Sequence, residues 1–398
     1  MKLLLITFYL NLCILYAQNQ SPKEFAILPW SEKMAKTILN DYPNLWQNEG
    51  KTQPTWGYTQ GLIALAFQKL YEETGKQEYF DYIKKYYETV IDSNGTILNY
   101  KLTNYSLDDI NAGKVLFFLY DKTDDKRYKI AIDTLIKQLE THPRTQAGGY
   151  WHKKRYPYQM WLDGVYMAAP FLAEYSIRNN KTEIIKDIVN WILIVEEKTR
   201  NQETGLLHHA WDENKIEKWA DPITGKSPHI WGRAIGWYAM ALVDVMDFLP
   251  KNSVEYKQIQ KVLERLVKSM IKYQDKTGAW YQVVDKIDQE GNYREGSVTA
   301  MMAYAILKGV NKGYLKTSYK KYGIKAYMSI LNNLSIIKNN WHITITPVCA
   351  VAGLGGNPYR DGSYEYYINE KKRDNDPKAT GPFILASIEY EKIKKIKK

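Results

Sequence analysis

Three short segments combine an ionisable side chain with tryptophan and glycine, a combination that is typical of binding sites. They are residues 161–164 (Trp-Leu-Asp-Gly), 208–212 (His-His-Ala-Trp-Asp) and 231–237 (Trp-Gly-Arg-Ala-Ile-Gly-Trp). Together they supply a carboxylate, an imidazole, a guanidinium and several indole rings. These are the groups needed to hold a sugar ring and to move a proton onto it. That chemistry requires a fold that brings the segments together.

Asp163 is the first candidate for proton transfer. It stands at the start of a predicted helix, where a carboxylate can instead act as an N-cap that accepts backbone N–H bonds. Its neighbours Trp161, Tyr166 and Met167 favour the chemical interpretation, because burial raises the pKa of a carboxyl toward neutrality. Asp108 starts the preceding predicted inner helix and allows the same two interpretations. Two carboxyls facing one pocket would suit acid–base work on a glycoside.

Basic and aromatic side chains accompany these carboxyls. Arg233 offers a bidentate fork to a carboxylate, and the alternative for it is a structural salt bridge. His208 and His209 would point to opposite sides of an extended loop, so we expect only one of them, His209, in the pocket. Stacking on a sugar face, or else plain core packing, is expected of Trp56, Tyr58, Trp151, Trp211, Trp231 and Trp237.

A repeat of about 50 residues organises the chain, which indicates stacked or ring-closed units. Residues 70–79 match 119–128 in form, and a looser third copy lies near residue 175. Each unit has an inner helix that is apolar nearly all round and an amphipathic, lysine-rich outer helix. The predicted inner helices span 57–71, 110–120, 163–175, 236–248 and 297–310, and the outer ones 79–91, 128–141, 183–198 and 255–274.

The return loops from outer to inner helices carry glycine and aromatic residues, as in 148–152 and 205–211. About six such hairpins predict an all-α toroid, for which an open solenoid is the competing architecture. Closure is favoured because the apolar inner helices need a crowded centre. In a toroid all return loops lie on one face, which would place Asp108, His152, Asp163, His209 and Arg233 around one mouth.

Length and composition agree with an exported, single-domain protein. Residues 1–17 are predicted to be a signal peptide, because Lys2 precedes an apolar run over 3–15 and Ala17 offers a cleavage site. The run is short for a membrane span, and an uncleaved anchor is the alternative. Residues 25–392 are predicted to form one domain. Cys349 would be the only cysteine after cleavage, so no intrachain disulfide is expected in the periplasm or outside the cell.

The formal net charge of +11 fits either an acidic polysaccharide partner or a solvated, lysine-rich surface. No nucleic-acid motif is present, and we expect no nucleic-acid partner. The six histidines lack compact metal-ligand spacing, and no phosphate loop or serine elbow occurs. The sequence therefore predicts neither a metal nor a cofactor. The glycine-rich run 353–362 is expected to form a tight loop that approaches the mouth.

From about residue 30 to residue 391 the chain resembles glycoside hydrolase family 105, the unsaturated rhamnogalacturonyl and glucuronyl hydrolases. The motifs that carry the resemblance are residues 107–111 (Leu-Asp-Asp-Ile-Asn), 160–164, 209–212, 231–240 and 355–367. The resemblance implies an (α/α)6 barrel, in agreement with the repeat. It also implies substrates with a 4,5-unsaturated uronic acid at the non-reducing end, as polysaccharide lyases leave it.

The reaction that the resemblance implies is hydration of a vinyl ether. The equivalent of Asp163 would protonate C4 and assist attack of water at C5, and the equivalent of Asp108 would assist at the same site. The residues implied to line the pocket are His209, Arg233, Trp211, Trp231 and Trp237, with Lys153 and His152 as further contributors. The usual family segment is Trp-Gly-Arg-Gly-Asn-Gly-Trp, and here Ala234 and Ile235 replace its second Gly and its Asn. This replacement could change the specificity for the sugar that follows the uronate.

We therefore expect an enzyme that acts on acidic oligosaccharides derived from rhamnogalacturonan or ulvan. Two other functions fit the same toroid. A polysaccharide lyase would create the unsaturated bond instead of consuming it. A non-catalytic sugar-binding protein would have little use for a carboxyl in an apolar setting.

Overall fold

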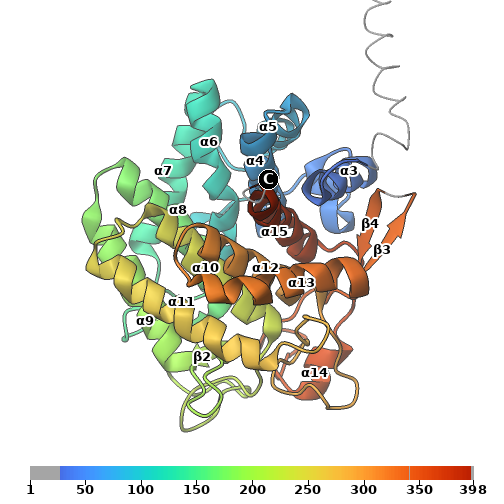
Figure 1. The fold of residues 1–398 in the computed structure, drawn as a ribbon. Helices are drawn as coiled ribbons and strands as arrows, with labels where there is room; N and C mark the ends of the chain where they lie inside the picture. Colours follow the sequence, from blue (N-terminus) through green and yellow to red (C-terminus); the bar gives the residue numbers. More distant parts are fainter. Residues whose placement is uncertain (1–26, 340, 396–398) are drawn as a thin grey trace, which may run out of the picture.

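The computed structural model describes residues 27–339 and 341–395, and in it helices alternate between an inner and an outer layer (Figure 1). The inner helices are α4 (Tyr58–Thr74), α6 (Lys114–Thr123), α8 (Leu162–Arg178), α10 (Gly232–Val245), α12 (Gly296–Asn311) and α15 (Pro377–Lys395). The outer helices are α3 (Trp30–Asp41), α5 (Gln77–Val90), α7 (Lys126–Thr141), α9 (Thr182–Thr199), α11 (Val254–Met270) and α13 (Lys320–Asn333). Paired inner and outer helices of this kind are an (α/α)6 barrel.

The ring closes through the last inner helix. Helix α15 packs against α12 on one side and against α4 on the other, and it also contacts α3. The two ends of the described chain therefore meet, which confirms a closed toroid and excludes the open solenoid. Figure 1 shows α15 beside α4 accordingly.

The layers follow from the side chains. Every residue of α10 is buried, so this helix is surrounded by protein on all sides. In α5 the buried residues include Tyr79, Ile83, Tyr86 and Val90, the three- and four-residue spacing of a helix with one inward face. Inner helices approach closely at small residues, since a Cβ added at Gly61 would lie 2.5 Å from the Cα atom of Ala112.

The helices predicted from the sequence are all present, with bounds shifted by a few residues. The second inner helix begins as the 3-10 helix η3 (Leu107–Gly113), and α10 begins early enough to include residue 233 in its first turn. Helices α3, α13 and α15 complete the six pairs and were given no bounds by the sequence pattern. The other 3-10 helices are η1 (Leu45–Gly50), η2 (Leu102–Asn104), η4 (Met246–Phe248), η5 (Ile271–Tyr273) and η6 (Thr317–Tyr319).

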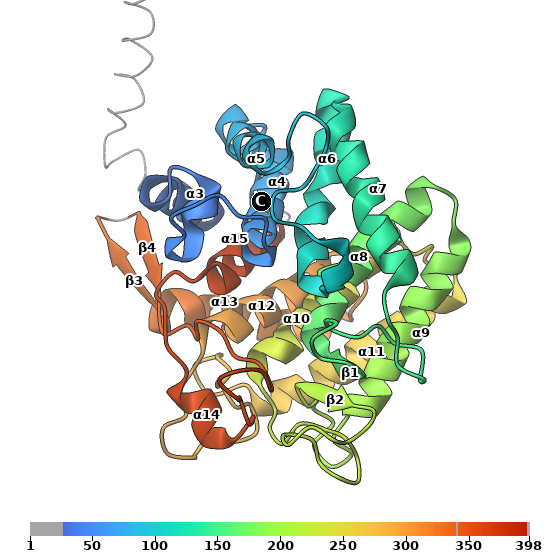
Figure 2. The ribbon, with the colours of Figure 1, turned by 180° about the vertical axis from the view of Figure 1, so that it is seen from behind.

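One two-stranded ladder, one short hairpin and one short helix lie outside the ring of helices. Strand β1 (Gln159–Trp161) pairs antiparallel with β2 (Ala210–Asp212), with Met160 opposite Trp211. Strand β3 (Ser335–Lys338) pairs antiparallel with β4 (His342–Ile345). Figure 2 shows β1, β2 and helix α14 (Tyr364–Asn369) at the same end of the molecule. The β1–β2 ladder runs directly into α8 and holds its first turn in place.

The predicted signal peptide, residues 1–17, lies outside the described residues. Within the described ranges, no helix is both long enough and apolar enough to cross a membrane.

Candidate active site

A cavity of about 180 Å³ opens where the inner helices begin. Its wall is built from the first turns of α4, η3, α8, α10 and α15 and from two loops, 152–156 and 351–360. The lining residues are Tyr58, Asp108, His152, Lys153, Arg155, Tyr156, Trp161, Asp163, Met167, Trp231, Arg233, Trp237, Val351, Ala352, Arg360 and Lys378. The volume is below that of most drug-sized sites and suits a single sugar ring.

Asp163 occupies the first turn of α8 with its carboxyl free for chemistry. Residue 161, not Asp163, is the N-cap of this helix, and no side chain caps it. The Asp163 side chain is 13% exposed, and its Oδ2 atom faces Nε2 of His209 at 3.3 Å. Within the described chain, Oδ2 of Asp163 is buried without a hydrogen-bond partner. Asp163 therefore does not cap α8, and its carboxyl is available to a ligand.

His209 is held behind Asp163 by two aromatic side chains. Its Nδ1 atom is 2.8 Å from the hydroxyl of Tyr367, and its ring centroid is 4.7 Å from that of Trp231. Burial raises the pKa of Tyr367, so the phenol keeps its proton. When this hydroxyl donates to Nδ1, the ring proton is on Nε2, the nitrogen that lies 3.3 Å from Oδ2 of Asp163 without a hydrogen bond between them. His208 turns the other way and bonds the carbonyl of Ser227, as the extended-loop argument predicts.

Replacing Tyr367 with Phe should lower kcat about tenfold and change KM little, because the imidazole loses the bond that fixes its tautomer. Steady-state kinetics on an unsaturated disaccharide would measure both constants. Tyr364→Phe is the matched control, because it removes a phenol hydroxyl from the same short helix. The hydroxyl of Tyr364 bonds the carbonyls of Gln289 and Glu290. A positioning role for Tyr367 is contradicted if the two variants show equal kcat.

Asp108, on the neighbouring helix η3, is held as an anion in the same cavity. Burial would raise the pKa of its carboxyl, but the ion pair with Lys153 outweighs burial and keeps that pKa below its usual range. Burial lowers the pKa of neighbouring His152 to about 3, so this imidazole is neutral at physiological pH. His152 also stacks on Trp161, with ring centroids 4.5 Å apart. Asp108 is thus suited to orient water or to stabilise positive charge.

Asp109, the next residue on η3, lines a second cavity. Burial and the charge of Asp108 raise the pKa of its carboxyl to about 6. Aspartate in an unfolded chain titrates near pKa ~3.9, so the folded protein binds this proton more tightly than the unfolded one. Stability therefore falls as the pH rises from about 4 to about 6, by on the order of 2 kcal/mol.

Asp109→Asn should accordingly raise the melting temperature more at about pH 8 than at about pH 4, because only the ionised carboxylate is disfavoured by the fold. Calorimetric melting of both proteins at the two pH values would test this. A shift of the same size at both would show that Asp109 titrates normally.

Arg233 borders the cavity but is largely committed to the protein. Its Nε donates to Ser297, one Nη1 hydrogen donates to the carbonyl of Ala350, and Nη2 donates to the carbonyl of Cys349 and to Glu295 at 3.2 Å. Burial would lower the pKa of Arg233, but the Glu295 carboxylate outweighs it and raises the pKa. Of five N–H donors, one on Nη1 is left for a ligand. Arg233 therefore forms the structural salt bridge and also borders the cavity, but the bidentate fork expected for a ligand carboxylate is already bonded to the protein.

Most of the other predicted residues also meet at the cavity. Tyr58, Trp231 and Trp237 line it, and Trp237 stacks on the buried ring of Tyr166. Trp56, Trp151 and Trp211 do not line it, and His209 lies buried behind Asp163 and not in the wall. The Trp56 indole bonds the carbonyl of Asp109, and the Trp211 indole bonds that of Thr224. Both rings pack in the core because the strand and loop that carry them turn the indoles away from the mouth.

Several lining residues were not predicted. Arg155 and Tyr156 follow His152 and Lys153 in the same return loop, which was the available signal. Arg360 comes from the glycine-rich run that was expected to approach the mouth, and its guanidinium bonds the hydroxyl of Tyr156 at 2.7 Å. Val351 and Ala352 directly precede that run, and Lys378 belongs to α15, whose bounds the pattern did not reveal.

The described residues contain no group of three or more histidine, cysteine, aspartate or glutamate side chains that could hold a metal ion.

Comparison with known proteins gives consistent relatives. The sequence profile of Glycosyl Hydrolase Family 88 matches residues 30–394. A solved family 105 glycoside hydrolase of C. acetobutylicum ATCC 824 is 42% identical, with a TM-score of 0.88 over 92% of this chain and 100% of that one. The unsaturated rhamnogalacturonyl hydrolase YesR of Bacillus subtilis is 24% identical over 69% of this chain and 75% of its own length. The 36% identical Protein Atu3128 of Agrobacterium fabrum covers 56% of this chain and 97% of its own length.

Proposed function

The chain belongs to glycosyl hydrolase family 88, and from this premise we propose that it removes a 4,5-unsaturated uronic acid from the non-reducing end of lyase-generated oligosaccharides. The observation that carries the proposal is the unequal pair of carboxyls in one small cavity. Asp108 is locked as an anion by Lys153, while Asp163 has an unbonded oxygen facing a fixed imidazole. One group is therefore suited to stabilise charge and the other to transfer a proton.

The reaction begins with transfer of a proton from the Asp163 carboxyl to C4 of the uronate, which breaks the C4–C5 π bond and leaves an oxocarbenium centre at C5. Water then adds at C5 and returns a proton to the Asp163 carboxylate. The hemiketal opens to a ketone at C5, and the former ring oxygen becomes a hydroxyl at C1. That C1 hemiacetal collapses to an aldehyde and releases the leaving sugar, so one water is consumed in total.

The other cavity residues would stabilise this sequence. Asp108 is an anion that can offset the positive charge developing at C5. The rings of Trp231, Trp237 and Tyr58 offer faces for the sugar. The free Nη1 hydrogen of Arg233 is a donor for the uronate carboxylate.

Leaving-group dependence tests this reaction against ordinary displacement at C1. In the hydration, the bond to the leaving group breaks after the proton transfer, so kcat/KM should be nearly constant across aryl glycosides of the unsaturated uronate whose phenols differ in pKa. Displacement at C1 would make kcat/KM rise steeply as the phenol becomes more acidic, and that slope would refute the hydration.

Export and the leaving sugar complete the proposal. Lys2 and the apolar run 3–15 support export to the periplasm or exterior, which N-terminal sequencing of the mature protein would check. The leaving sugar is rhamnose from rhamnogalacturonan or sulfated rhamnose from ulvan. Ala234 and Ile235, which replace Gly and Asn of the usual family motif, are fully buried in α10. Their effect on specificity for the leaving sugar is therefore indirect.

A further inference from the structure

We propose that Lys154 and Arg155 form a subsite for an anionic group, a sulfate or a carboxylate, on the leaving sugar. This inference rests on the proposed function, because it assigns the part of the substrate that extends beyond the unsaturated uronate. It is carried by the position of these two side chains at the edge of the cavity, by their lack of carboxylate partners, and by the rigid turn that presents them.

The position follows from two cavities that share a wall. The cavity around Asp163 and a second, more open one of about 640 Å³ are both lined by Lys153 and Arg155. Helix η3 contributes Asp108 to the first and Asp109 to the second. A sugar linked to a uronate beside Asp163 therefore has room on the Arg155 side.

The cations at this edge differ in how they are neutralised. Lys153 is paired with Asp108, and Lys378, at the start of α15, is paired with Glu49 at 2.7 Å. In the described part of the chain, neither Lys154 nor Arg155 forms an ion pair with a carboxylate. The Lys154 ammonium lies 5.8 Å from the Tyr105 centroid and the Arg155 guanidinium 4.9 Å from that of Tyr156. The charge of Arg155 also favours the ionised forms of Asp108 and Asp109 without forming an ion pair with either.

The backbone beneath these side chains is fixed. Tyr156 donates its N–H to the carbonyl of Lys153, which closes a tight turn with Lys154 and Arg155 at its tip. The Lys154 N–H is in turn bonded to the carbonyl of Tyr105 at 3.1 Å, and Lys153 bridges to Ser106. Both tip side chains are exposed on a preorganised turn, so binding of an anion orders little chain.

The second cavity supplies further partners suited to such a group. Thr103, Asn104 and Ser106 contribute neutral hydrogen-bonding groups to its wall, and Asp109 contributes the one carboxyl. The two positive charges of Lys154 and Arg155 and the one negative charge of an ionised Asp109 give this wall a net charge of one positive unit. A sulfated or carboxylated leaving sugar would meet a basic surface, whereas a neutral one would not gain from it.

Binding to the inactive Asp163→Asn protein tests the subsite without requiring turnover. Isothermal titration calorimetry would compare the unsaturated sulfated disaccharide from ulvan with the same disaccharide after chemical desulfation, and with an unsaturated digalacturonate. We expect the anionic disaccharides to bind about tenfold more tightly than the desulfated one, with the preference weakening as salt is added. Preference for one anionic ligand over the other tells whether sulfate or carboxylate is the natural group.

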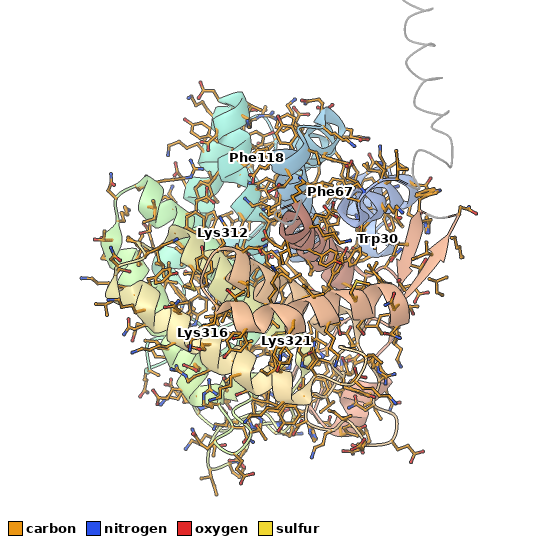
Figure 3. All side chains as sticks on the ribbon, in the orientation of Figure 1. Trp30, Phe67, Phe118, Lys312, Lys316 and Lys321 are labelled. Carbon is orange, nitrogen blue, oxygen red and sulfur yellow. The ribbon has the colours of Figure 1, made fainter. Side chains whose placement is uncertain are left out.

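Lys154→Gln with Arg155→Gln, introduced into the same protein, should reduce the ratio of affinities to within about twofold. The matched control is Lys268→Gln with Lys321→Gln, which removes two charges from exposed lysines on α11 and α13. Among the described residues, neither of these lysines has a carboxylate partner. Lys321, labelled in Figure 3, sits 5.1 Å from its neighbouring Tyr322 ring, much as Lys154 sits beside Tyr105.

Equal binding of charged and desulfated disaccharides, or a ratio that survives the Lys154 and Arg155 changes, would overturn the subsite. Failure of the proposed function has a different signature, since the wild-type protein would then release no sugar from any of the three disaccharides. Turnover of all three at equal affinity would thus refute the subsite and leave the proposed function standing.

Discussion

Replacing Asp163 with Asn is expected to lower kcat by at least about 10³-fold, the upper part of the range for loss of a general acid–base group. The amide keeps the shape of the carboxyl but cannot deliver a proton to C4 or accept one from water. Because the cavity wall is otherwise unchanged, affinity for an unsaturated disaccharide should stay within about threefold. Steady-state kinetics and isothermal titration calorimetry would measure the two quantities.

Asp361→Asn provides the control for that experiment. Asp361 is an exposed aspartate in the loop that follows the cavity wall, and its carboxylate accepts a bond from the backbone of Ser363. Its replacement makes the same chemical change outside the lining. If Asp163→Asn kept more than about a tenth of wild-type kcat, Asp163 would not be the proton donor.

Replacing Arg233 with Met is expected to lower the free energy of unfolding by about 3–5 kcal/mol, because Glu295 would be left as a buried charge without its partner. Both side chains are at most 1% exposed. Glu295 also accepts bonds from the backbone of Cys349 and Val298, so its setting ties the 349–352 loop to the start of α12. The melting temperature at neutral pH should fall by about 5 °C.

The pH dependence distinguishes this charge effect from loss of packing. An isolated Glu295 carboxyl would have a raised pKa, and the destabilisation of Arg233→Met should therefore be larger at about pH 8 than at about pH 5. Adding Glu295→Gln should restore part of the lost melting temperature. If Arg233→Met melts like the wild type and only KM rises, Arg233 serves the ligand alone and the buried pair is not structural.

The sequence repeat predicts much of the architecture. The alternation of all-round apolar and amphipathic helices predicts the two layers, and the return loops predict that Asp108 and Asp163 share one mouth. Helix α15 was not predicted, because it contains Pro382 and ends in a lysine-rich stretch that masks the apolar pattern. Helix α15 is the element that closes the ring. The sequence argument for closure therefore relied only on the crowded centre that apolar inner helices need, and not on the residues of α15.

Individual side-chain directions were less predictable than the fold. The sequence pattern assigned Trp56, Trp211 and Trp231 to the same mouth, but the indoles of Trp56 and Trp211 bond core carbonyls instead of facing the cavity. Arg155 and Arg360 line the cavity although one stands at the tip of a polar turn and the other in a glycine-rich loop. Residue type and spacing place a segment at the mouth, whereas the rotation of its side chains depends on contacts from distant elements.

The most direct test of the account is ultraviolet absorbance of lyase-digested rhamnogalacturonan and lyase-digested ulvan, each mixed with the purified protein. The account predicts that the enol-ether band of at least one digest disappears with the wild-type protein and persists with Asp163→Asn, and the responding digest identifies the leaving sugar. A band that is unchanged on both digests, or that grows on intact polymer as a lyase would make it grow, would contradict the account.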